Sequence, residues 1–292
     1  MKSFLEKLGF YILFSLLYLV SILPMWLLYG FSYMLYVVAF YIFGYRRSVV
    51  VQNLSRSFPE MLYGEIRNTC RKFFKTFFFH FAEIIKSTSI SSKKQLKKVE
   101  FIGFDIAEEY IKQGKSVIAC MGHCANWEML NVLPRTVGFP ICAGYKPLEN
   151  NIMDRLMKTL RSRFGVKPIP SNSLARHILG KEEGAAMYYF LADQSPMKVD
   201  DKYWITFLHQ PTGMFPGAEK LAKASGSAVV FLHMTQVAKG RYRIECKPMF
   251  EDAKQTKDTE IIKQYAKMLE DNIYEQPWGW LWSHRRWKRP HH

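Results

Sequence analysis

The sequence predicts an α/β protein in which a mainly parallel sheet is flanked by helices and preceded by membrane-anchoring helices. Three observations support this prediction. From about Val99 onward, short apolar runs alternate with helical stretches, which is the order of elements in parallel sheets. No charged residue occurs between positions 8 and 45, and the region from 48 to 98 is basic and rich in phenylalanine. We therefore divide the chain into a membrane anchor of one or two apolar helices (1–47), a basic, aromatic helical region (48–98) and an α/β domain (99–292).

The uncharged N-terminal stretch is divided by Pro24 into a shorter and a longer half. A membrane-spanning helix needs about 20 apolar residues, and the longer half reaches that length alone. Two lysines precede the stretch, and Arg46 and Arg47 end it. This pattern fits two spanning helices with both ends in the cytoplasm, or one spanning helix and one that lies in the interface. A buried helical hairpin of a soluble protein would also produce it, whereas a cleavable signal peptide would be shorter and followed by small residues.

A single long helix is expected between residues 61 and 87. Within it, Phe74, Phe77, Phe78 and Phe81 recur at the spacing of one helix face. Lysines and arginines occur in the same segment, so the helix could rest on an anionic bilayer surface. It could equally pack on the domain as a core helix, or do both with different faces.

The α/β domain contains six candidate strands and five candidate helices. The strands cover residues 116–121, 141–145, 186–191, 203–207, 228–233 and 241–247. The helices cover residues 126–135, 153–164, 174–179, 218–224 and 259–274. A Lys239-Gly240 turn pairs the last two strands.

Polar residues follow three of these strands. The clusters are Gly122-His123, Tyr145-Lys146-Pro147 and Asp193-Gln194. In open α/β sheets, binding sites form outside the carboxyl ends of the strands. We therefore expect the three clusters to form the walls of one pocket.

The first cluster begins a segment in which a histidine and a carboxylate, His123 and Glu128, are five positions apart. A histidine held by a carboxylate can take a proton from an alcohol. On one uninterrupted helix, residues at this spacing point about 140° away from each other. His123 must therefore precede the helix, and Glu128 must reach back from its first turns to orient the imidazole ring and stabilise the imidazolium.

Other catalytic chemistries lack their sequence signatures. Neither a Gly-x-Ser-x-Gly nucleophile motif nor a Gly-rich phosphate loop occurs in the sequence. Cys120, His123 and Cys124 supply three candidate zinc ligands where a structural site needs four, so buried cysteines are the simpler interpretation. The five cysteines form no disulfide framework, which favours a reducing compartment. The economical mechanism is direct attack by a hydroxyl on an activated acyl donor such as a thioester.

The chain carries 41 Lys and Arg against 25 Asp and Glu, a formal net charge of +16. This excess indicates an anionic partner: nucleic acid, anionic lipid headgroups or an acidic carrier protein. An aromatic content of 15% and the uncharged stretch favour lipid and argue against nucleic acid. The C-terminal segment has the pattern of a membrane interface, where cations meet phosphates and Trp rings lie at headgroup depth. Its residues are Trp282, Arg285, Arg286, Trp287, Lys288 and Arg289.

Five ordered blocks of the chain, between about Val50 and Pro290, carry a family resemblance. They are Asn53-Leu54 with Phe58-Pro59-Glu60, then Gly122-His123 with Asn126-Trp127-Glu128, then Tyr145-Lys146-Pro147-Leu148-Glu149-Asn150, then Ala192-Asp193-Gln194-Ser195-Pro196, and the tail from Trp280 to Pro290. With these blocks the chain resembles the late acyltransferases of lipid A biosynthesis, a branch of the glycerolipid acyltransferases that share a His-x4-Asp/Glu motif.

The resemblance implies a glycerolipid-acyltransferase-like α/β fold on the cytoplasmic face of a Gram-negative inner membrane. It implies transfer of a fatty acyl group from acyl carrier protein to a hydroxyl of a lipid A precursor, with no cofactor. His123 and Glu128 match the family's catalytic pair. The expected substrate-binding residues are Asn126, Tyr145, Lys146, Asp193, Gln194, Arg285 and Arg286.

The chain departs from the family pattern at two positions. Ala125 replaces the usual Gly before Asn-Trp-Glu, which we expect to be a small change. Lys146 stands where the family usually has Arg, and this changes a bidentate anion contact into a point-charge contact. The acceptor could therefore be another lipid, namely a lysophospholipid, an amino-acid lipid or an aryl-polyene lipid. A non-catalytic module that binds anionic lipid is the remaining alternative.

Overall fold

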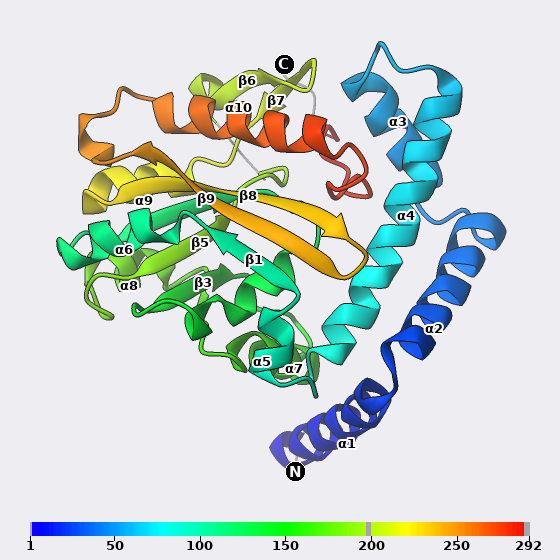
Figure 1. The fold of residues 1–292 in the computed structure, drawn as a ribbon. Helices are drawn as coiled ribbons and strands as arrows, with labels where there is room; N and C mark the ends of the chain where they lie inside the picture. Colours follow the sequence, from blue (N-terminus) through cyan, green and yellow to red (C-terminus); the bar gives the residue numbers. More distant parts are fainter. Residues whose placement is uncertain (1, 197–199, 289–292) are drawn as a thin grey trace.

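The computed structural model describes residues 2–196 and 200–288 (Figure 1). Arg289 and Pro290, which the sequence places in the basic C-terminal segment, lie outside the described residues.

A seven-stranded sheet forms the centre of the α/β domain, with the strand order β1-β9-β8-β2-β5-β3-β4. Its strands are β1 (Val99–Ile102), β2 (Val117–Met121), β3 (Ile141–Tyr145), β4 (Lys167–Pro170), β5 (Met187–Leu191), β8 (Ala228–Ala238) and β9 (Arg241–Phe250). Every neighbouring pair is parallel except β8 and β9, which form the expected antiparallel hairpin. The prediction of a mainly parallel sheet flanked by helices is confirmed.

Four strands, β6 (Trp204–Phe207), β7 (Gln210–Gly213), β1 and β4, differ from the prediction. The expected strand at 203–207 forms as β6, but it pairs with β7 in a separate hairpin outside the main sheet. Leu208 and His209 turn this hairpin with positive φ angles of 48° and 62°, the backbone that two-residue hairpin turns require. The sequence did not predict the edge strands β1 and β4. Each has four residues. Two of the four in β4 are prolines, which have no backbone N–H to donate to a neighbouring strand and therefore occur in edge strands.

Helices cover the sheet. They are α5 (Ser92–Leu96), α6 (Phe104–Lys112), α7 (Asn151–Ser162), α8 (Leu174–Leu179), α9 (Gly217–Ser225) and α10 (Glu260–Glu275). Of these, α10 packs against β8 and α6 packs against β9 and β2 (Figure 1). The expected helix at 126–135 is a 3-10 helix, Trp127–Arg135, which contains Pro134.

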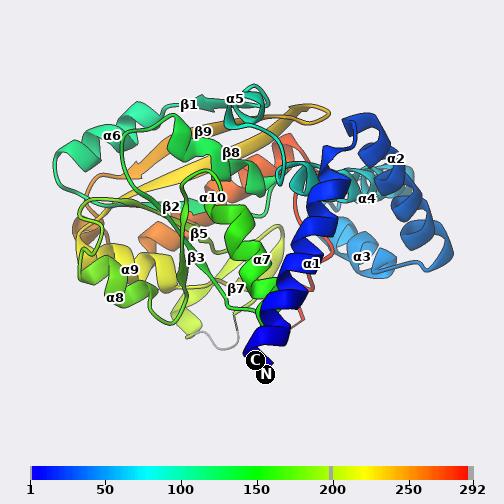
Figure 2. The same cartoon turned by 90° about the horizontal axis from the view of Figure 1, so that it is seen from below.

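Two apolar helices begin the chain, as predicted: α1 (Lys2–Ile22) and α2 (Met25–Val37), which continues as a π-helical turn, Val38–Ile42. Each contains an 18-residue stretch that is long and apolar enough to cross a membrane. The helix α1 lies beside α7, and Phe10 is buried there with Leu156 and Leu160 (Figure 2). At its other end, Lys86 Nζ donates to the carbonyl oxygens of Ser21 and Leu23 at 2.9 and 3.0 Å.

The region between the apolar helices and the sheet consists of α3 (Arg47–Ser57) and α4 (Tyr63–Lys86). The helix α4 packs against α2, and its residues Ile66, Cys70 and Phe74 belong to the same core as the sheet. The phenylalanines of the predicted helix face lie in different environments: Phe74 is fully buried, whereas Phe81 is 45% exposed. The core-helix interpretation of this segment is therefore confirmed for the face that carries Phe74.

Candidate active site

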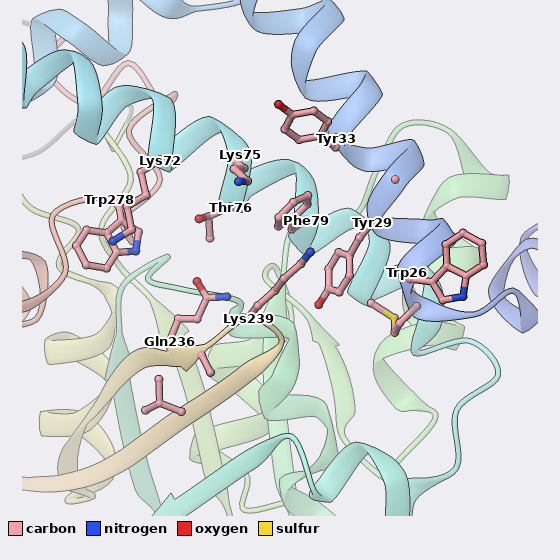
Figure 3. A pocket seen from close by; sticks show the side chains of 14 residues that line it. Trp26, Tyr29, Tyr33, Lys72, Lys75, Thr76, Phe79, Gln236, Lys239 and Trp278 are labelled. Atoms are coloured by element: carbon pink, nitrogen blue, oxygen red, sulfur yellow. The ribbon is translucent and has the colours of Figure 1, made fainter.

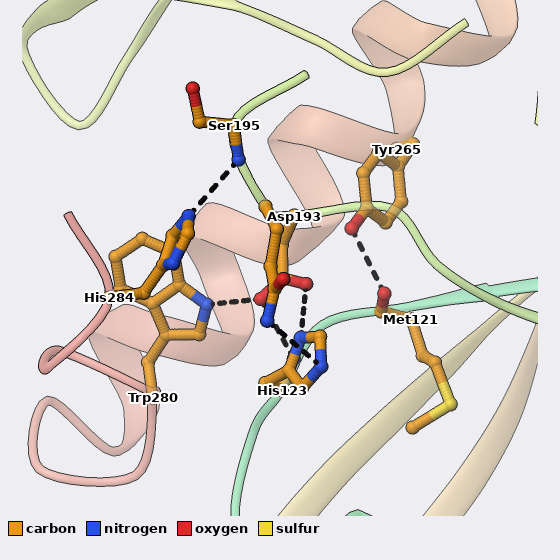
Figure 4. Close-up of polar contacts among 8 residues, drawn as sticks. Met121, His123, Asp193, Ser195, Tyr265, Trp280 and His284 are labelled. Carbon is orange, nitrogen blue, oxygen red and sulfur yellow. Dashed lines mark hydrogen bonds and ion pairs between the residues drawn. The ribbon is translucent and has the colours of Figure 1, made fainter. Parts of the chain in front are cut away.

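The carboxyl ends of β2 and β5 bring two of the predicted polar clusters together. The two strands are parallel neighbours, with Met121 opposite Leu191. The chain continues from these residues to His123 and Asp193, so that both side chains emerge at one edge of the sheet (Figure 4). Strand β3, which precedes Tyr145, pairs with β5 on its other side.

His123 and Asp193 form a tightly bonded pair. The ring atom Nδ1 of His123 lies 2.6 Å from Oδ1 of Asp193, and the backbone N–H of His123 donates to Oδ2 at 2.8 Å. The Asp193 side chain is 2% exposed and the His123 side chain 13%. A Cβ at Gly122 would lie 2.4 Å from Leu269 Cδ1, so any side chain here would have to displace the fully buried Leu269.

A third donor completes the Asp193 site. Trp280 Nε1 donates to Asp193 Oδ2 at 2.7 Å (Figure 4). Burial by itself would raise the pKa of Asp193, but the nearby His123 and these three hydrogen bonds lower it to about 2. Asp193 is therefore a carboxylate at neutral pH.

The hydrogen bonds of Asp193 fix the tautomer of His123. An ionised carboxylate only accepts hydrogen bonds, so Nδ1 of the neutral ring must carry the proton. Nε2 then has a free lone pair and can accept a proton from a hydroxyl group. Gln194 Nε2 lies 3.4 Å from His123 Nε2, a long contact on the exposed side of the ring.

Glu128 does not contact His123, which corrects the predicted pairing. Its carboxylate binds Arg161 of α7 through both oxygens, with Nη2 at 2.5 Å and Nε at 3.1 and 3.2 Å. Asn131 Nδ2 donates to the same carboxylate at 2.9 Å. The 3-10 helix directs Glu128 toward α7 instead of back toward the strand end, and Asp193 occupies the ring nitrogen that Glu128 was expected to bind.

Asn126 is buried and bonded to another carboxylate. Its Nδ2 donates to Glu83 Oε2 at 2.7 Å. The hydroxyls of Tyr29 and Tyr242 also donate to Glu83, at 2.8 and 2.5 Å. Asn126 thus joins the site to α4, and Glu83, 1% exposed, is held by three donors.

The second predicted cluster stays apart from the His123–Asp193 pair. Tyr145 is 9% exposed and its hydroxyl has no partner among the residues that the structure describes. Lys158 Nζ lies 5.3 Å from the centre of its ring. Lys146 is exposed. The structure therefore joins the clusters after β2 and β5 through the contact of His123 with Asp193, while Tyr145, after β3, lies beside Lys158 of α7.

Two residues of the C-terminal segment are packed into the protein, which corrects the predicted membrane-interface role for Trp282 and Arg286. Trp282 is fully buried and Arg286 is 3% exposed. Arg286 Nη2 donates to the carbonyl of Gly213 at 2.7 Å, and burial lowers the pKa of Arg286 to about 10. Arg285 and Lys288 are exposed. A guanidinium enclosed by the hairpin β6–β7 cannot reach a phosphate at a bilayer surface.

Sequence reasoning assigned no role to several residues around His123. The ring of Trp127 packs edge-on against His123, with the ring centres 4.8 Å apart. His284 Nε2 accepts a hydrogen bond from the backbone of Ser195 at 3.1 Å, and burial lowers the pKa of His284 to about 4. Trp280 is separated from Asp193 by 87 positions, so no local spacing could have indicated their contact.

A small cavity of about 10 Å³ lies beside His123, between α4 and the segment 278–281. Its wall includes Phe73, Phe77 and His80. Burial lowers the pKa of His80 to about 4, and its Nε2 has no partner among the described residues. Within residues 2–196 and 200–288, no group of three His, Cys, Asp or Glu side chains could hold a metal ion.

Comparison with known proteins gives one family and several relatives. The family described as bacterial lipid A biosynthesis acyltransferase matches residues 2–289. A lipid A biosynthesis acyltransferase of Haemophilus influenzae is 28% identical over 166 residues, which cover 56% of this chain and 52% of that protein. Two Escherichia coli proteins align more widely. The lipid A biosynthesis palmitoleoyltransferase is 24% identical over 83% of this chain and 79% of its own length. The myristoyltransferase is 22% identical over 81% and 73%.

Proposed function

Because the chain belongs to the bacterial lipid A biosynthesis acyltransferase family, we propose that it transfers a fatty acyl group from an acyl carrier protein thioester to a hydroxyl of a lipid A precursor. The observation that carries this proposal is the His123–Asp193 pair, which leaves Nε2 of a partly exposed imidazole free to act as a base. The net charge of +16 suits an acidic carrier protein and a phosphorylated acceptor.

In the proposed mechanism, His123 Nε2 takes the proton of the acceptor hydroxyl as its oxygen attacks the thioester carbonyl. The tetrahedral intermediate then collapses, the carbon–sulfur bond breaks, and the imidazolium returns its proton to the departing thiolate. Asp193 keeps the ring in the correct tautomer and stabilises the imidazolium. The reaction forms one ester, releases one thiol and consumes no other reactant.

We assign Glu128 a positioning role in this mechanism. In its ion pair with Arg161, the Glu128 side chain is 11% exposed and the Arg161 side chain is 28% exposed. The pair fixes the 3-10 helix to α7, and Trp127, the residue before Glu128, packs on the catalytic ring. Loss of Glu128 would leave Arg161 unpaired and would release this wall of the site.

The N-terminal helices support attachment to a membrane, and we propose the cytoplasmic face of the bacterial inner membrane. One face of α1 contacts α7, where Asn151 Nδ2 donates to Glu6 and the Arg155 guanidinium lies 4.1 Å from the centre of the Phe10 ring. The opposite face is an exposed apolar stripe of Leu5, Leu8, Ile12, Leu16 and Leu19.

This geometry favours an interfacial position for α1. If α1 crossed the bilayer, the charged residues of α7 beside it would enter the hydrocarbon, at a cost of about 3 kcal/mol each. The same argument applies to α2, because it packs against α4 and the centre of its Tyr29 ring lies 3.9 Å from Lys239 Nζ. We therefore propose that both apolar helices lie in the bilayer interface. We expect Leu16→Lys, in the exposed stripe, to weaken co-flotation with anionic vesicles, while Leu179→Lys, at an equally exposed site on α8, does not. Equal flotation of both variants would contradict this arrangement.

Acyl transfer is tested with purified protein, acyl carrier protein that bears a labelled acyl group, and a lipid A precursor. We expect label to move to the lipid with the wild type and not with His123→Ala. Mass spectrometry of lipids from a deletion strain then identifies the acceptor. Intact lipid A together with loss of another acylated lipid would favour the lysophospholipid, amino-acid lipid or aryl-polyene lipid. Turnover by His123→Ala would refute the mechanism.

A further inference from the structure

A large cleft adjoins the cavity of His123. It has a volume of about 1000 Å³ and lies between α2, α4 and the turn of the β8–β9 hairpin (Figure 3). Thr76 and Trp278 line both the cleft and the small cavity that contains His123. The cleft and the cavity beside His123 therefore share a wall, which these two side chains form.

Three lysines from two elements face this cleft. Lys72 and Lys75 lie one turn apart on α4, and Lys239 comes from the hairpin on the opposite side (Figure 3). Each ammonium group lies over an aromatic ring. Lys72 Nζ is 2.9 Å from the centre of the Trp278 ring, and Lys239 Nζ is 3.9 Å from that of Tyr29. These rings hold the cations in place but do not neutralise them.

The three positive charges lack a carboxylate partner. Within residues 2–196 and 200–288, none of the three ammonium groups forms an ion pair or a hydrogen bond with another side chain. Glu83 is the carboxylate that acts on Lys239, yet it is buried and already accepts three hydrogen bonds. Burial lowers the pKa of Lys239, and the charge of Lys75 lowers it further. A bound anion would relieve this repulsion.

The other side of the cleft is apolar. It includes α2, where Trp26 is 70% exposed and Tyr33 is 48% exposed. A ligand that satisfies both sides carries an anionic group for the lysines and apolar chains for α2. Phosphorylated lipids have this composition, whereas a soluble anion would use only the lysines.

We propose that Lys72, Lys75 and Lys239 bind a phosphate monoester of the acceptor lipid and thereby direct its reactive hydroxyl to His123. The proposal rests on the acyl transfer proposed above and adds the site that recognises the acceptor. The charged side chains position the substrate, and they take no part in bond making or breaking.

The test compares Lys72→Gln, Lys75→Gln and Lys239→Gln with Lys112→Gln. Lys112 is an exposed lysine of α6 on the far side of the sheet from α2 (Figures 1 and 2). We expect each cleft variant to raise the KM for the phosphorylated acceptor about tenfold, since charged hydrogen bonds contribute on the order of one such factor. The KM for acyl carrier protein should stay within about twofold, and Lys112→Gln should match the wild type on both measures.

A second substrate separates phosphate recognition from other effects. With an enzymatically dephosphorylated acceptor, the KM of the wild type should rise to the value that the lysine variants show with the phosphorylated acceptor. The KM of the lysine variants should change little when the phosphate is removed. Equal losses with both acceptors, or a rise in the KM for acyl carrier protein instead, would overturn the proposal. Full competition by inorganic phosphate at equal concentration would also overturn it, since it would show a general anion site.

Binding without turnover keeps this test independent of the proposed reaction. Trp278 lies under the Lys72 ammonium, so its fluorescence should respond when micelles of the phosphorylated acceptor are added to the wild type, and not when they are added to the triple Gln variant. An enzyme that binds in this way but transfers no acyl group would sink the proposed function and leave the lysine site supported. No response of the wild type would refute the lysine site.

Discussion

Replacing Asp193 by Asn tests the central feature of the site with the smallest change in shape. Three N–H donors converge on this side chain: the backbone N–H and Nδ1–H of His123, and Nε1–H of Trp280. An amide has one acceptor oxygen and adds two donors, so one of these contacts becomes donor against donor. The ring escapes that clash by moving its proton to Nε2, and His123 then has no free lone pair toward the cavity.

We expect Asp193→Asn to lower kcat about 10³- to 10⁴-fold, the loss known when the aspartate of a Ser-His-Asp triad is neutralised. The assay is acyl transfer at saturating substrates, together with ¹⁵N NMR of the imidazole, which reports the tautomer directly. Glu128→Gln is the comparison, because it keeps the His123–Asp193 pair; its imidazole should retain the wild-type tautomer. Activity of Asp193→Asn above a tenth of wild type, or a tautomer change in Glu128→Gln alone, would restore the role first expected of Glu128.

Two further predictions concern stability. The pKa of Asp193 lies near 2 instead of 3.8, so its charge stabilises the fold by about 2 kcal/mol above pH 4, and this contribution is lost as the pH falls from about 4 to 2. Denaturant unfolding should therefore show the difference between wild type and Asp193→Asn shrinking over that range, and a constant difference would contradict the shift. Ala125 has a φ of +47°, which costs an L-residue about 1–2 kcal/mol, partly offset by the entropy that glycine adds to the unfolded chain. Ala125→Gly should raise the free energy of unfolding by about 0.5–1 kcal/mol, and a lower value would show that neighbouring contacts relieve the strain.

Local pattern was sufficient to predict the strands that carry the site. Val117 to Met121 is an apolar run followed by Gly-His, and all five residues are buried in the middle of the sheet. The rule that parallel strands end at a common edge then placed His123 near Asp193, although the two residues are 70 positions apart. The edge strand β4 could not be predicted in this way, because its two prolines are residues that strands rarely contain.

The partners of each polar group depend on long-range packing and were not predictable. The sequence offered Glu128 as the nearest carboxylate to His123, but spacing cannot show that Arg161 of α7 takes it or that Asp193 lies closer. Composition misled in a similar way at the C-terminus, where alternating Trp and Arg suggested a membrane interface. The same pattern fills a core when the guanidinium finds a carbonyl such as that of Gly213.

The region from 48 to 98 links the apolar helices to the chemistry. Asn53 Nδ2 donates to the carbonyl oxygens of Trp282 and His284, which holds the segment that carries Trp280 over Asp193. Glu83 of α4 binds Asn126, so the same region also fixes the segment that follows His123. Glu83 also accepts a hydrogen bond from Tyr29 of α2, so this one carboxylate joins the apolar helix to the motif segment. In the proposed membrane arrangement, this joint fixes the position of His123 relative to α2, and the lysine cleft between α2 and α4 faces an acceptor that stays embedded by its acyl chains.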